Sequence, residues 1–126
     1  MLTTLVQENP TFYIYGAQVV AYSAYRAIKH LTGKQPQNFL VGNKEGNPAE
    51  IEGIEVITPE NVSRDSFIIV AVSELLQGEI VADLRQRGFN DLYLLTANAE
   101  HLLMQSYFDS LGIFPLILWL TVTILA

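Results

Sequence analysis

The sequence predicts an α/β fold: a three-layer sandwich with a mainly parallel sheet of about five strands and helices on both faces. Two observations support this prediction. Strand-like and helix-like segments alternate along the middle of the chain, as they do when parallel strands are joined by crossover helices. Residues 66–72 are apolar after the first, as expected of a central strand that is covered on both faces.

The expected strands are short apolar runs bounded by polar or turn-forming residues. They are predicted at residues 12–15, 39–41, 54–57, 66–72 and 91–95. The polar stretch at residues 42–48 is expected to be a loop over the ligand-binding edge of the sheet.

The expected helices follow the strands. They are predicted at residues 17–31, from Ser73 to Gly88, and from Thr96 or Asn98 to about residue 110, with a short helical turn at residues 58–60. The first has apolar residues at helical spacing, and Gly33 is placed to end it. The second has Leu76, Ile80 and Leu84 along one face.

Length and composition limit the function classes. At 126 residues the chain is long enough for one domain, expected at residues 1–110, followed by an apolar tail at residues 111–126. A net charge of −6 argues against a nucleic-acid partner, which needs a concentrated basic face. The absence of cysteine excludes disulfides and thiolate catalysis. No metal site is expected. The N-terminal residues lack the pattern of a secretory signal, so a cytoplasmic protein is expected.

The turn after the first predicted strand carries the clearest functional signal. An apolar strand ends at Gly16 and a helix pattern begins at once, which is the layout of a Rossmann first unit. Aligned on G-x-G-x-x-G, the chain has Gly16, Gln18 and Ala21. The tight turn and the close packing of helix on strand are kept. The Gln18 side chain, however, stands where the backbone would approach a diphosphate.

Candidate binding residues are those at the carboxyl ends of the parallel strands, where such sheets bind ligands. The amide groups near the turn are candidates for phosphate, and the residues after the second strand are candidates for the ribose or sugar. The candidates are Gly16, Ala17, Gln18, Val19, Asn43, Lys44, Val72, Ser73 and Thr96. No catalytic residue is predicted, because His30 and His101 lie far apart in different helices and the helical carboxylates are expected to be solvated.

Several segments together resemble a known kind of module. They are Tyr-Gly-Ala-Gln-Val-Val-Ala, Phe-Leu-Val-Gly-Asn, Ile-Glu-Gly-Ile-Glu-Val-Ile-Thr-Pro-Glu-Asn-Val, Phe-Ile-Ile-Val-Ala-Val and Leu-Arg-Gln-Arg-Gly-Phe-Asn-Asp-Leu-Tyr-Leu-Leu. Over about residues 12–97 the chain resembles the small Rossmann-like modules of bacterial surface-polysaccharide and teichoic-acid biosynthesis proteins. The resemblance implies a nucleotide or nucleotide-sugar ligand and a transferase domain or subunit as partner.

The apolar tail leaves three readings open. After Asp109 no residue is charged, so the tail is expected to be buried in this domain or a homodimer, to lead into a following domain, or to contact a membrane. As a helix, 16 residues reach about 24 Å, short of a bilayer core.

Three functions compete on the sequence alone. The favoured one is a non-catalytic module that binds a nucleotide or nucleotide-sugar. The second is a structural or oligomerisation domain with a degenerate site, and the third is an NAD(P)-dependent oxidoreductase.

Overall fold

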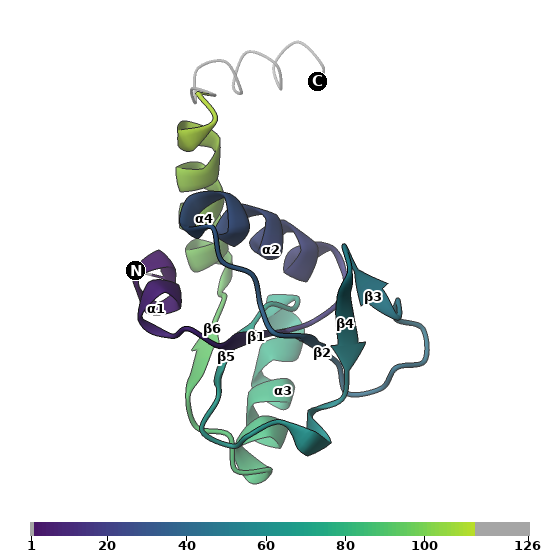
Figure 1. Ribbon diagram of the computed structural model, residues 1–126. Coiled ribbons are helices and arrows are strands. Elements are labelled where there is room, and N and C mark those ends of the chain that lie inside the picture. The colour runs from purple at the N-terminus through teal and green to yellow at the C-terminus, as the bar shows by residue number, and fades with distance from the viewer. Residues whose placement is uncertain (1, 113–126) are drawn as a thin grey trace.

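The computed structural model describes residues 2–112, which form an α/β fold (Figure 1). The four helices are α1 (Leu2–Glu8), α2 (Val19–Thr32), α3 (Glu74–Gln86) and α4 (Ala97–Ser110). The six strands are β1 (Phe12–Tyr15), β2 (Phe39–Leu40), β3 (Glu50–Ile51), β4 (Ile54–Ile57), β5 (Phe67–Val70) and β6 (Leu92–Leu94). A 3-10 turn, η1 (Pro59–Asn61), follows β4, where the short helical turn was expected.

The strands form one sheet in the order β3-β4-β2-β1-β5-β6. All neighbouring pairs are parallel except β3 and β4, which form an antiparallel hairpin. The sheet therefore has six strands instead of about five. The extra strand is β3, whose two residues are too few to show an alternating pattern.

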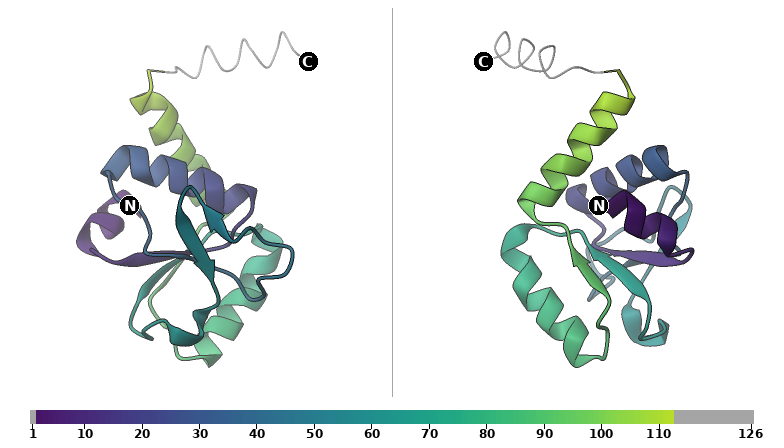
Figure 2. Two further views of the ribbon diagram at one scale, coloured as in Figure 1. Left: turned by 45° about the vertical axis from the view of Figure 1, so that its right-hand side comes forward. Right: turned by 90° about the vertical axis from the view of Figure 1, so that its left-hand side faces the viewer.

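Helices cover both faces of the sheet, which gives three layers (Figure 2). On one face α1, α2 and α4 bury Val6, Ile28 and Leu103 against inward-facing residues such as Phe12 and Phe39. On the other face α3 buries Leu84 against the sheet.

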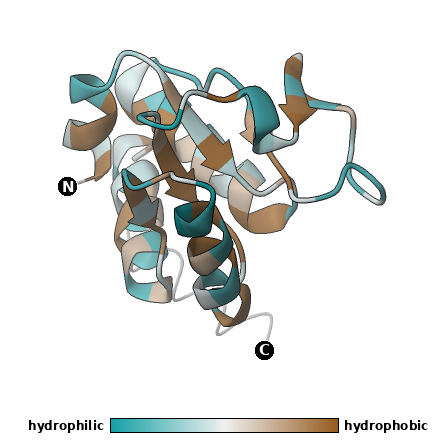
Figure 3. Ribbon diagram, turned by 90° about the horizontal axis from the view of Figure 1, so that it is seen from below, coloured by the Kyte–Doolittle hydropathy of each residue, from teal (hydrophilic) through white to brown (hydrophobic). Residues whose placement is uncertain are grey.

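The segment predicted as a central strand is β5, which lies inside the sheet but next to the edge strand β6, and it contributes to both layers of core. Phe67 and Ile69 face α2, while Ile68 and Val70 face α3, and all four are buried. This two-sided burial explains the apolar sequence of the segment. In Figure 3 the hydrophobic colour gathers on the central strands, and the loop between β2 and β3 is mostly hydrophilic.

The ends of the helices mostly agree with the sequence prediction. Gly33 ends α2 in a left-handed conformation, with φ 74°, and its N–H donates to the carbonyl of Lys29. Thr96 caps α4 by accepting a hydrogen bond from the Ala99 N–H at 3.2 Å. Ser73 stands before α3, but its side chain makes no capping bond.

Two ends of the chain need separate comment. Helix α1 was not predicted; it is short, and only Leu2 and Val6 mark its buried face. At the other end α4 finishes at Ser110, and the predictions for the tail fall on residues 113–126, outside the described part. Within residues 2–112 no helix has the length and apolar character needed to cross a bilayer.

Candidate functional site

The sheet order places a switch point between β1 and β5. From β1 the chain crosses through α2 to β2 on one side, whereas β5 and β6 lie on the other side (Figure 1). Open α/β sheets bind ligands outside the carboxyl ends of their strands at such a point. The loops that leave β1 and β5 here contain Gly16 and Ser73.

A pocket of about 460 Å³ lies at this switch point. It is bounded by the start of α2, the ends of β2 and β5, and the first two turns of α3. The residues that line it are Tyr15, Gly16, Ala17, Gln18, Val19, Val20, Val41, Gly42, Asn47, Ala71, Val72, Ser73, Leu76 and Ile80. Most of these side chains are apolar, as in typical small-molecule sites with a few polar groups for orientation.

Gly16 brings the backbone of β1 directly against the end of β5. Its φ of 125° is a conformation that other residues rarely adopt. A Cβ atom at this position would overlap the carbonyl oxygen of Ala71 and lie 3.2 Å from the Ala21 Cβ. The turn therefore needs glycine both for its conformation and for the close approach of strand and helix.

The start of α2 presents free amide groups to the pocket. Tyr22 is the first residue whose N–H bonds within the helix, to the Gln18 carbonyl at 3.0 Å. The N–H groups of Val19 and Val20, which line the pocket, precede that bond and have no intrahelical acceptor. The Gln18 side chain does not cap them. A helix start of this kind favours an anionic group.

The side chain of Gln18 is bonded to the loop that follows β2. Its amide nitrogen donates to the Asn47 Oδ1 at 2.8 Å, and the Asn47 amide donates to the Asn43 carbonyl at 2.8 Å. This chain of hydrogen bonds ties the start of α2 to the polar loop at the mouth of the pocket.

A buried glutamine fixes the opposite wall. Gln77 is 3 % exposed, and its side-chain amide donates to the carbonyls of Val72 at 3.1 Å and Leu95 at 2.7 Å. It thereby joins α3 to the ends of β5 and β6. Glu74 adds a second link, because its carboxylate accepts a hydrogen bond from the Ala97 N–H at 3.0 Å.

Tyr15 lines the pocket, and its hydroxyl lies near Gly42. Burial raises the pKa of this hydroxyl above its ordinary value of 10.0, and the negative charge of Asp83 raises it further, while Arg87 opposes both effects. The hydroxyl is therefore protonated at neutral pH.

The structure brings six of the nine predicted site residues together and leaves three apart. Those that line the pocket are Gly16, Ala17, Gln18, Val19, Val72 and Ser73. Asn43 and Lys44 are exposed in the loop after β2 and do not line it. The Asn43 side chain instead accepts a hydrogen bond from the Glu45 N–H. Thr96 follows β6, one strand beyond the switch point, and is occupied as a helix cap.

Sequence reasoning missed the rest of the pocket lining: Tyr15, Val20, Val41, Gly42, Asn47, Ala71, Leu76 and Ile80. Several of them carried a signal. Tyr15, Val41 and Ala71 lie at or beside the predicted strand ends, and Gly42 and Asn47 fall in the loop predicted over the ligand-binding edge. The sequence did not show that Asn47 would bond Gln18, because only the path of the loop brings the two together.

The titratable residues singled out in the sequence lie elsewhere. The His30 ring packs on Tyr107, with ring centroids 5.3 Å apart. Asp83 on α3 and Arg87, directly after the helix, form an exposed ion pair at 3.0 Å. Within residues 2–112 no three His, Asp or Glu side chains gather as a metal site would need.

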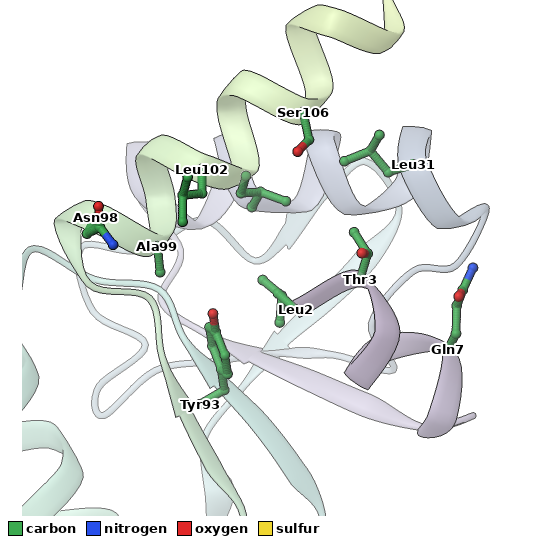
Figure 4. Close-up of a pocket in the computed structure, with 10 residues that line it drawn as sticks. Leu2, Thr3, Gln7, Leu31, Tyr93, Asn98, Ala99, Leu102 and Ser106 are labelled. Atoms are coloured by element: carbon green, nitrogen blue, oxygen red, sulfur yellow. The ribbon is translucent and has the colours of Figure 1, made fainter.

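A second, smaller cavity lies at the β6 edge of the sheet, between α1 and α4 (Figure 4). Its volume is about 340 Å³, and Leu2, Tyr93 and Leu102 are among the side chains that point into it. It has no glycine turn and lies away from the switch point, so it lacks the features that mark the switch-point pocket.

Comparisons with known proteins add no assignment. No protein-family model matches the chain, and no curated protein is significantly similar to it. The function must therefore be argued from the pocket itself.

Proposed function

We propose that the chain is a Rossmann-like module that binds a nucleotide or nucleotide-sugar in the switch-point pocket. The observation that carries the proposal is the meeting of a glycine turn and free α2 amides with an apolar cavity at the carboxyl ends of β1 and β5. The amides suit a phosphate, and the apolar walls around Val72, Leu76 and Ile80 suit a base or sugar face.

The resemblance to modules of bacterial surface-polysaccharide biosynthesis supports the sugar-linked form of the ligand. In that setting the chain supplies recognition, and a transferase domain or subunit supplies the chemistry. The residues that line the pocket include no histidine or carboxylate.

A ligand panel tests the proposal. Thermal unfolding is followed with NAD(H), NADP(H), UDP-, GDP- and CDP-linked sugars, CDP-choline and plain nucleotides. A ligand at 100 times its Kd adds about 2.7 kcal/mol to the unfolding free energy, which raises the Tm by several degrees. A Tm that no ligand of the panel raises would contradict the proposal.

A charge variant then locates the site. Ser73→Asp places an anion at the pocket, and because aspartate is a good N-cap, α3 keeps its start. We expect about tenfold weaker nucleotide binding. Thr4→Asp, at an exposed position of α1 outside the pocket, is the matched control and should bind nucleotides as the natural chain does. Equal binding by both variants would place the ligand elsewhere.

A second candidate is a structural domain whose site is closed. The observation in its favour is the hydrogen bond from Gln18 to Asn47, which bridges the helix start and the loop at the pocket mouth. This reading predicts no response from any ligand in the panel.

A further inference from the structure

Tyr15 lines the pocket, and its hydroxyl has no hydrogen-bond partner among residues 2–112. Tyr15 ends β1 and is 7 % exposed, with its side chain in the layer of core beneath α3. It lines the switch-point pocket and also a neighbouring cavity with Ile80 and Asp83, so it forms part of the wall between them. Only burial and charge act on its pKa, and within residues 2–112 no polar side-chain atom is both sealed from solvent and unbonded. The hydroxyl is therefore not sealed from solvent, and because no described residue bonds it, it is free to bond a ligand.

Because Gly42 has no side chain, it leaves room for the Tyr15 hydroxyl. A Cβ atom at position 42 would lie 3.0 Å from the Tyr15 Oη, closer than such contacts normally are. Gly42 is not among the residues with positive φ, so its backbone conformation does not require glycine. The geometry instead links this glycine to the tyrosine, whose hydroxyl reaches the carboxyl end of β2.

That position has a defined role in nucleotide-binding sheets. An acidic side chain at the end of the second strand normally accepts a hydrogen bond from a ribose hydroxyl. In this chain Asn43 and Lys44 follow the strand, and neither lines the pocket. The Tyr15 hydroxyl lies beside Gly42, which lines the pocket just after this strand.

We infer that the Tyr15 hydroxyl binds a ribose hydroxyl of the nucleotide and so makes the pocket selective for ribonucleotides. The inference rests on the proposed function. A neutral phenol can both donate and accept here, and its raised pKa keeps it protonated at neutral pH.

The test compares discrimination between sugars in matched variants. Binding of UDP, CDP, ADP and GDP, and of their 2′,3′-dideoxy counterparts, is measured by calorimetry. Tyr15→Phe removes the hydroxyl and leaves the ring. Tyr13→Phe makes the same change on the same strand and the same side of the sheet, outside the pocket.

The natural chain and Tyr13→Phe should bind the ribose form of at least one nucleotide about fivefold tighter than its dideoxy form. Tyr15→Phe should bind the two forms within about twofold of each other, because the hydrogen bond is absent from both complexes. Gly42→Ala, whose Cβ would move the hydroxyl by a few tenths of an ångström, should weaken this discrimination without abolishing it.

The failures of the two proposals differ. Ribose discrimination that survives in Tyr15→Phe would overturn the role of Tyr15 and leave nucleotide binding intact. If the natural chain binds none of the nucleotides, the proposed function is wrong and the role of Tyr15 falls with it.

Discussion

The backbone at Gly16 has neither the conformation nor the space for a side chain. Gly16→Ala forces an L residue to a φ of 125° and pushes its Cβ against the Ala71 carbonyl. We expect a loss of roughly 3 kcal/mol or more in unfolding free energy, measured by urea denaturation. Gly46→Ala is the matched control, with φ 80° and open space around it, and should cost only about 1 kcal/mol. Similar losses at the two positions would mean that the contact with Ala71 is unimportant.

Variants at Gln18 test whether its side chain obstructs a diphosphate or only bonds the loop at Asn47. Gln18→Ala removes the hydrogen bond to Asn47, whereas Gln18→Gly also removes the Cβ and restores the spacing that lets a diphosphate approach. Glycine is acceptable at an N-cap, so α2 should still form. We expect Gln18→Gly to bind nucleoside diphosphates about fivefold tighter than Gln18→Ala in calorimetry. Equal affinities would show that the side chain does not obstruct the ligand.

Tyr15 also gives stability a pH dependence with a defined sign. Its pKa is raised above 10.0 in the folded chain, so the unfolded chain loses this proton first. The contribution of Tyr15 is therefore complete below pH 10 and is lost as the pH rises through the folded pKa. Urea unfolding between about pH 9 and pH 11 should show a steeper fall for the natural chain than for Tyr15→Phe. If the unfolding free energies of the two chains fall in parallel with pH, the raised pKa of Tyr15 is contradicted.

At the scale of elements, Gln77 holds the pocket wall together. Gln77→Leu keeps the side chain's approximate size and leaves the Val72 and Leu95 carbonyls without their donor. We expect a loss of about 1–3 kcal/mol in unfolding free energy. Gln86→Leu, on the exposed side of the same helix, should change it by no more than about 0.5 kcal/mol. The prediction fails if the two variants are equally stable.

The sequence predicted elements well where a pattern was long or strongly apolar. β1 and β4 have the predicted bounds, because each apolar run stops at polar or turn residues. β5 is shorter than predicted, since the apolar run continues into Ala71 and Val72 beyond the last paired residue. α1 and β3 escaped prediction because seven and two residues give too little periodicity.

The site was predictable only as far as it is local. The glycine turn is formed by residues that are adjacent in the sequence, so Gly16 to Val19 were identified from the sequence. Asn47 enters the pocket through the path of a loop, and the link between Tyr15 and Gly42 joins two strands. Such contacts depend on register and side-chain direction, which no spacing in the sequence reveals. For the same reason Thr96 was placed at the site, although the sheet order puts it one strand away.

At the scale of the whole molecule, the remaining prediction concerns association through the tail. Residues 111–126 contain no charged side chain, whereas every buried residue of the core lies between Leu2 and Leu103 in the described part of the chain. Deleting residues 111–126 therefore removes none of these buried residues. If the tail buries its apolar surface against a second copy, the full chain sediments as a dimer and the shortened chain as a monomer. Replacing Leu116, Leu118 and Leu120 together by serine keeps the length and should also give a monomer. A full chain that stays monomeric at every concentration would remove the homodimer from consideration.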